Sequence, residues 1–99
     1  MFIIIWEYQV KAGKRSEFED TYSPNGAWAG LFKKSPEYLG TELLRSDKQP
    51  LCYLTIDRWS SKEDFDAFHV HWGNVYKALD AQCEDLTESG SRIGTWDSL

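Results

Sequence analysis

Two histidines lie close together in the second half of the chain, at His69 and His71. In a helix, a spacing of two residues turns the side chains apart by about 200°, so the imidazoles cannot bind one metal ion together. A helical wheel places His69 at the edge of an apolar stripe and His71 well away from it. The pKa of an imidazole suits proton transfer at neutral pH, which makes His69 a candidate general base. Its alternative role is that of a boundary histidine satisfied by backbone or water.

The chain is rich in large rings, with five Trp, five Tyr and five Phe among its 99 residues. Such rings can form the walls of a flat apolar cavity between helices and a sheet, although packing in the core is their ordinary role. Two tyrosines, Tyr76 and Tyr22, can point a hydroxyl inward as hydrogen-bond donors. The candidate substrate-binding residues are Trp28, Phe32, Trp59, Phe65 and Trp72.

The passage from residue 51 to residue 79 contains most of these candidates. Residues 51–59 are rich in β-branched and aromatic side chains, which predicts a strand. Ser60 and Glu63 have the spacing of a helix-capping box. The apolar period then changes from about two residues to about 3.6. The predicted stripe of this helix consists of Phe65, Phe68, Trp72, Tyr76, Leu79 and Cys83, and it must cover the neighbouring sheet. The adjacent pair Asp57 and Arg58 is typical of a surface ion pair.

The remaining segments complete a recognisable order of elements. Strands are predicted over residues 2–10, 38–45 and 92–96, and a helix interrupted at residues 23–26 is predicted between the first two. The order β-α-β-β-α-β predicts a single α+β domain over residues 1–99 with the ferredoxin-like fold. In that fold a four-stranded antiparallel sheet carries both helices on one face.

The opposite face of such a sheet would be apolar and bare. Ile3 and Ile5 lie on the second face of the first strand, and the pattern places Tyr38, Tyr53, Leu43 and Leu51 near them. Large exposed apolar patches are rare on monomers. We therefore predict a homodimer that packs sheet against sheet about a two-fold axis.

Composition excludes several classes of function. The net charge of −5 argues against a nucleic-acid surface, and no apolar run is long enough to span a membrane. The opening residues lack the basic segment of a signal peptide, and Cys52 and Cys83 are too few for a disulfide framework. These features predict a cytoplasmic protein with free thiols. No nucleophile elbow, phosphate loop, dinucleotide fingerprint or zinc spacing is present.

Three phrases of the sequence resemble the antibiotic biosynthesis monooxygenase family. They are YQVKAGK in the opening strand, SPNGAWAGLFKKSPEYLGTELLR, and YLTIDRWSSKEDFDAF. The resemblance covers roughly residues 4 to 97. It implies a dimeric α/β barrel of ferredoxin-like subunits. The superfamily includes cofactor-free oxygenases that act on polycyclic phenols, haem-degrading enzymes and small isomerases, so the resemblance alone does not assign an activity.

The haem-degrading branch has a residue pattern that can be compared directly. It places an Asn on the first strand, and a Trp and a His ten residues apart on the second helix. The corresponding positions here are near Tyr8, at Phe68 and at Ala78. All three differ from the pattern, so a haem-degrading enzyme is kept only as the least favoured alternative. The cofactor-free oxygenases that the resemblance includes need no cofactor, and none is expected here.

The hypothesis that best fits the residues is a cofactor-independent monooxygenase that acts on a small (poly)aromatic phenol or quinol. In it, His69 would be the base and Tyr76 or Tyr22 the donor. The alternative is a non-catalytic dimer that binds a small hydrophobic ligand or has a structural role. A cavity of ~300 Å3 or more beside His69 would favour the enzyme, and a sealed core would favour the alternative.

Overall fold

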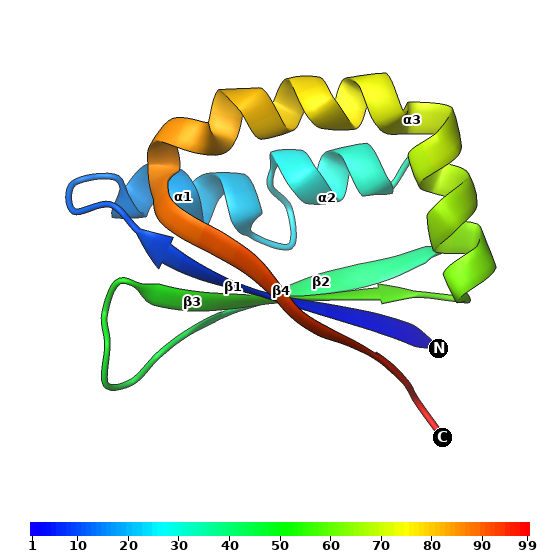
Figure 1. The fold of residues 1–99 in the computed structure, drawn as a ribbon, viewed down its shortest axis with the longest axis horizontal. Coiled ribbons are helices and arrows are strands. Elements are labelled where there is room, and N and C mark those ends of the chain that lie inside the picture. Colours follow the sequence, from blue (N-terminus) through cyan, green and yellow to red (C-terminus); the bar gives the residue numbers. More distant parts are fainter.

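The computed structural model describes all 99 residues and contains one four-stranded antiparallel sheet (Figure 1). The strands are β1 (Phe2–Val10), β2 (Tyr38–Arg45), β3 (Cys52–Trp59) and β4 (Thr87–Asp97). Their order in the sheet is β2-β3-β1-β4, with β1 paired to both β3 and β4. The predicted ferredoxin-like fold is confirmed.

All helices lie on one face of this sheet (Figure 1). They are α1 (Arg15–Tyr22), α2 (Ala27–Phe32) and α3 (Lys62–Cys83), and a short 3-10 turn, Glu84–Leu86, joins α3 to β4. No helix combines the length and the apolar character that a bilayer crossing requires. The last strand is longer than the predicted 92–96, because pairing with β1 extends it back to Thr87 through Gly90, despite the weak strand propensity of glycine.

The cap of α3 lies one residue later than predicted. Ser61, not Ser60, accepts a hydrogen bond from the backbone N–H of Asp64, at 3.1 Å. Ser60 still belongs to the sheet edge, since its N–H donates to the carbonyl oxygen of Glu37 at 2.9 Å. The predicted Ser60–Glu63 capping box is therefore wrong, and the helix starts after the last backbone pairing of β3.

The core lies between the sheet and the helices. Trp59 is fully buried there, with ring centroids of Phe68 and Phe32 at 5.1 and 5.6 Å. Along α3, Phe68 and Cys83 are buried as the predicted stripe requires. The helix is kinked at Trp72, whose φ and ψ of −109° and 15° are not helical, and Gly73 follows directly. The change of direction is visible in Figure 1.

The composition of the open sheet face differs from the prediction. Tyr53 is 1% exposed on the helix side, and Tyr38 and Leu43 also pack against the core there. Alternation along β3 places Tyr53 on the same side as Trp59, so it cannot face outward. The open face instead carries the partly exposed residues Ile3, Ile5, Leu54 and Ile56.

The turn between α1 and α2 is packed tightly against the end of α1. The N–H of Gly26 donates to the carbonyl oxygen of Ser23 at 2.9 Å. A Cβ at Gly26 would lie closer than 3.0 Å to the backbone carbonyl oxygens of Asp20 and Thr21. In contrast, a Cβ at Gly30, inside α2, would meet no atom within 4 Å.

These two glycines predict opposite effects on stability. Gly26→Ala should lower the free energy of unfolding by about 1–3 kcal/mol, because backbone atoms must move to make room. Gly30→Ala should be neutral or stabilising by up to about 1 kcal/mol, because alanine favours helix. Urea denaturation followed by circular dichroism measures both. Equal midpoints for the two variants would contradict the tight turn.

Candidate functional site

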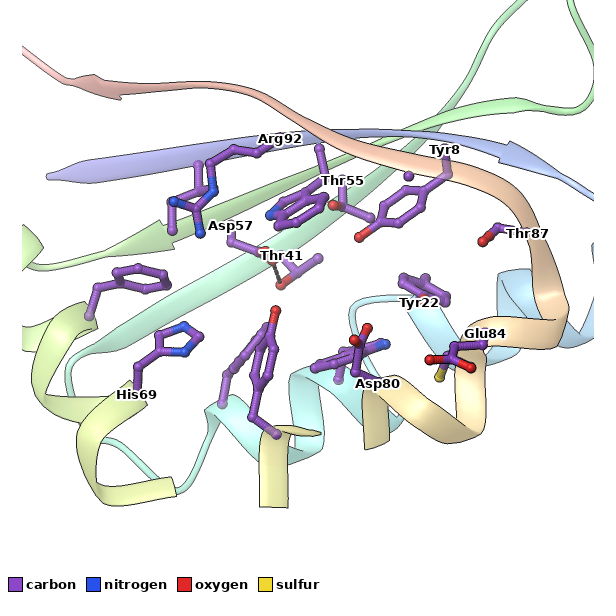
Figure 2. A pocket seen from close by; sticks show the side chains of 18 of the residues that line it. Tyr8, Tyr22, Thr41, Thr55, Asp57, His69, Asp80, Glu84, Thr87 and Arg92 are labelled. Carbon is purple, nitrogen blue, oxygen red and sulfur yellow. Dashed lines mark hydrogen bonds between the residues drawn. The ribbon is translucent and has the colours of Figure 1, made fainter. Parts of the chain in front are cut away.

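A cavity of about 360 Å3 lies between the helix-covered face of the sheet and the helices (Figure 2). Its volume lies at the lower end of the range for small-molecule sites. Strands β1 to β3 form the floor, α3 contributes a wall, and the first half of β4 closes one side. Side chains from every strand and from all three α-helices therefore meet at this one place.

The cavity brings together six of the eight site residues expected from the sequence. They are Tyr22, Trp28, Phe32, Phe65, His69 and Tyr76. The ring centroids of Trp28 and Tyr76 are 4.9 Å apart, so the walls from α2 and α3 touch.

Two expected residues do not line the cavity. Trp59 is fully enclosed in the core below it. Trp72 is turned aside by the kink of α3 and packs against His71, with 4.9 Å between the ring centroids, and under the ammonium of Lys34, at 5.1 Å. A helical wheel predicts which side of an element a residue faces. It predicts neither how deeply the residue is buried nor whether the helix is kinked.

His69 lies at one side of the cavity, between two rings. Its centroid is 4.3 Å from that of Phe65 and 4.7 Å from that of Tyr76. Partial burial lowers the pKa of His69 below its ordinary value, and the guanidinium of Arg92 lowers it further. The imidazole is therefore neutral at pH 7 and can accept a proton. His71 is exposed, as the wheel predicted.

A buried carboxylate in the cavity was missed by the sequence analysis. Asp57 projects from β3 toward the helices, and the hydroxyl of Thr41 on β2 donates to its Oδ1 at 2.5 Å (Figure 2). Burial raises the pKa of Asp57 from 3.8 to about 6, and the hydrogen bond from Thr41 partly offsets this effect. The expected surface pair with Arg58 is wrong, since Arg58 bonds Glu42 at 2.9 Å instead. Strand alternation was the available signal, because adjacent residues point to opposite faces.

Several hydroxyl groups surround the cavity. The hydroxyl of Tyr8 points into it (Figure 2), and Tyr22 and Tyr76 also line it. Burial is the largest cause that raises the pKa of all three phenols above the ordinary value. The next contributors are Tyr22 for Tyr8, Cys83 for Tyr22 and Asp80 for Tyr76. Each phenol thus keeps its proton at neutral pH and remains a hydrogen-bond donor.

Arg92 supplies the positive charge of the cavity. Its guanidinium lies over the rings of Trp6 and Phe65, at 5.5 and 5.8 Å from their centroids. The cavity thus combines aromatic walls, an imidazole, a buried carboxylate, three phenolic donors and one cation. The exposed carboxylates of Asp80, Glu84 and Glu88 also line it, where α3 joins β4. No group of three His, Cys, Asp or Glu side chains is placed to hold a metal ion.

The sequence profile of the antibiotic biosynthesis monooxygenase family matches residues 1–71 of the chain. The chain belongs to this family. The profile covers β1 to β3, α1, α2 and the first half of α3, which includes Asp57 and His69 but ends before Tyr76. No match was found among curated proteins.

Solved structures of the same fold cover nearly the whole chain. The cofactor-independent oxygenase SnoaB from Streptomyces nogalater is 18% identical with a TM-score of 0.75, over 98% of this chain and 91% of SnoaB. MhuD, in a structure that contains manganese protoporphyrin IX, is 22% identical with a TM-score of 0.74, over 100% of this chain and 95% of MhuD. A NIPSNAP family protein from Agrobacterium tumefaciens is 16% identical with a TM-score of 0.70, over 99% and 92%. At these identities the similarity shows the fold alone.

The raised pKa of Asp57 predicts a pH-dependent cost to stability. Because the folded pKa of about 6 exceeds the ordinary value of 3.8, the folded state favours the neutral acid. Stability is therefore greatest below about pH 4, falls as the pH rises to 6, and stays reduced above it. At pH 8 the free energy of unfolding of Asp57→Asn should exceed that of the parent by on the order of 2 kcal/mol. This difference should vanish near pH 4.

Urea denaturation at several pH values measures this effect. Asp47→Asn, in the exposed loop between β2 and β3, makes the same chemical change outside the cavity and should leave the pH profile as in the parent. If Asp57→Asn is less stable than the parent at pH 8, the carboxylate is not held in a desolvated site.

Proposed function

We propose that this protein is a cofactor-independent monooxygenase that oxidises a small (poly)aromatic phenol or quinol. The observation that carries the proposal is the cavity of about 360 Å3, which places aromatic walls, proton acceptors and phenolic donors around one ligand-sized space. Membership in the monooxygenase family supports the reaction class. A sealed core at this place would have favoured the non-catalytic alternative.

The proposed reaction demands little of the protein. A base removes a proton from an electron-rich aromatic substrate, and the resulting anion reacts with dioxygen to give a peroxide. For a substrate with a CH2 group, loss of water from the peroxide leaves a carbonyl group. The cavity walls exclude water, and hydroxyl donors stabilise the anion. Tyr76 and Tyr22 are the donors inferred from the sequence, and His69 is the base inferred from it.

The walls favour a flat substrate. Trp28, Phe32 and Phe65 line the cavity from α2 and α3, and their rings can stack on an aromatic system. The other part of the lining is polar and includes Asp57 and Arg92, groups that can orient one end of a ligand. These three residues are therefore the proposed substrate-binding set.

Haem degradation fits this chain poorly. The position of the branch's His corresponds to Ala78, which is exposed and outside the cavity. The position of its Trp corresponds to Phe68, which is buried in the core and does not line the cavity. The residues of that pattern are therefore neither conserved in type nor placed at the site.

The open sheet face supports a homodimer. Ile3, Ile5, Leu54 and Ile56 form an apolar patch on the face that no helix covers (Figure 1). A second copy packed against this patch would bury it. The two free thiols, Cys52 and Cys83, support the proposed cytoplasmic location.

Oxygen consumption tests the proposed activity. We expect the purified protein to consume oxygen with members of a panel of anthrones and quinols, as measured with an oxygen electrode. Tyr76→Phe should lower kcat by roughly 10²-fold, because it removes one donor to the developing oxyanion and keeps the ring. His71→Ala, an exposed change on the same helix, should match the parent. A ligand that binds without oxygen uptake anywhere in the panel would instead support the binding protein.

Sedimentation analysis tests the proposed dimer. The double variant Ile5→Lys, Ile56→Lys places charges on two residues that pair directly between β1 and β3, and it should convert the dimer into monomer. Val70→Lys alters an exposed apolar residue on α3, away from the open face, and should leave the dimer intact. A parent protein that sediments as a monomer would refute the proposal.

A further inference from the structure

Asp57 is not one of the residues that the sequence suggested for catalysis. We propose that Asp57 is the base of the reaction, taking the substrate proton on its Oδ2 while Thr41 holds its Oδ1. This inference rests on the proposed function, since it assigns the proton transfer within that reaction. His69 is the alternative proton acceptor.

The single hydrogen bond that Asp57 accepts leaves its second oxygen unbonded. Oδ1 accepts from the Thr41 hydroxyl at 2.5 Å, and no lysine, arginine or histidine forms an ion pair with the carboxylate. A carboxylate has about four acceptor positions, so one bond leaves most of its capacity unused. Asp57 is only 9% exposed, yet it lines the cavity. Its unbonded oxygen is therefore available to a bound molecule and to little else.

A buried carboxylate without a cation is costly, and the surrounding groups do not remove that cost. The titratable groups that interact with it are Tyr8 on β1, Tyr38 on β2 and Tyr76 on α3. The charge of Asp57 raises the pKa of all three phenols, so they stay neutral and supply no positive charge beside it. Arg92 lies elsewhere in the cavity, over Trp6 and Phe65. Charged groups in such surroundings are rare in purely structural positions and are typical of functional sites.

The position of Asp57 suits proton transfer better than that of His69. Burial strengthens Asp57 as a base, while the pKa of about 6 still leaves it ionised at pH 7. Burial has the opposite effect on His69 and weakens it as a base. Asp57 also lies among the phenolic hydroxyls of Tyr8 and Tyr76, which can hold the oxygen of the anion that forms.

Thr41 is a positioning residue in this scheme. Its hydroxyl bonds Asp57 on one side and the hydroxyl of Tyr38 on the other, which fixes its rotamer. The bond also stabilises the ionised carboxylate and so lowers the pKa of Asp57. Removal of the Thr41 hydroxyl should therefore raise that pKa and move the acid limb of the activity profile to higher pH.

The transfer itself balances. The substrate C–H bond breaks, its electron pair stays on the substrate carbon, and the proton moves to Oδ2 of Asp57. The carbanion then reduces dioxygen and forms a C–O bond to it, which gives a peroxide anion. Asp57 returns the proton to the outer peroxide oxygen. Loss of the second C–H proton together with hydroxide then gives the carbonyl group and water.

An anaerobic experiment isolates the first step. The probe is 1,8-dihydroxy-9-anthrone, whose anion absorbs differently from the neutral form. Stopped-flow mixing with the protein without oxygen measures anion formation alone. We expect rapid anion formation with the parent and with Asp47→Asn, and a rate at least roughly 10²-fold lower with Asp57→Asn. Thr41→Val should shift the acid limb of the rate profile to higher pH, which loss of packing alone would not do.

Three results would overturn the role of Asp57. They are an unchanged rate in Asp57→Asn, a greater loss in His69→Ala than in Asp57→Asn, and the absence of anion formation in the parent. Asp57→Asn must unfold cooperatively in urea for its rate to count, and Thr41→Val gives an independent readout through its pH profile. If the parent forms the anion but consumes no oxygen after air is admitted, Asp57 stands as the base and the oxygenase proposal fails.

Discussion

The side chains on the helix-facing side of β3 determine where the cavity lies. Alternation places Tyr53, Thr55, Asp57 and Trp59 on that side. The two rings at the ends pack against the helices, Tyr53 against Phe18 at 4.9 Å and Trp59 against Phe68 at 5.1 Å. Thr55 and Asp57, between these rings, are smaller and do not reach as far toward the helices. The rings therefore hold the helices away from the sheet, and the cavity lies over Thr55 and Asp57.

This arrangement costs stability in a small domain. A chain of 99 residues has a limited core, and a desolvated carboxylate within it is unfavourable at neutral pH. The aromatic cluster that joins Trp59, Phe32, Phe65 and Phe68 offsets that cost through burial and edge-to-face contacts. Groups that are needed for activity commonly lower the stability of the fold that holds them. The cost of Asp57 is thus a physical argument for function that does not depend on similarity.

Family and fold constrain the chemistry without naming the substrate. The family profile ends within α3, and the three solved structures compared above share only 16–22% of their residues with this chain. One of them is a cofactor-independent oxygenase and another contains a manganese porphyrin. The same fold therefore supports different chemistries, and the distinction comes from the side chains in the cavity. Here these are one buried and three exposed carboxylates, phenols, an imidazole, a guanidinium and aromatic walls.

Local periodicity was sufficient for the order of strands and helices and for the ferredoxin-like fold, because hydrophobic period and turn signals lie within short stretches of sequence. Six of the eight site residues expected from the sequence also line the cavity. Depth, register and the helix kink depend on segments distant in the chain. Only the tertiary structure enclosed Trp59, turned Trp72 away, placed Tyr38 and Tyr53 against the helices and moved the cap to Ser61. The tertiary structure also raised the pKa of Asp57, because burial removes water from the carboxylate. Burial depends on segments that are distant in the sequence, so the neighbours of Asp57 in the chain could not reveal it.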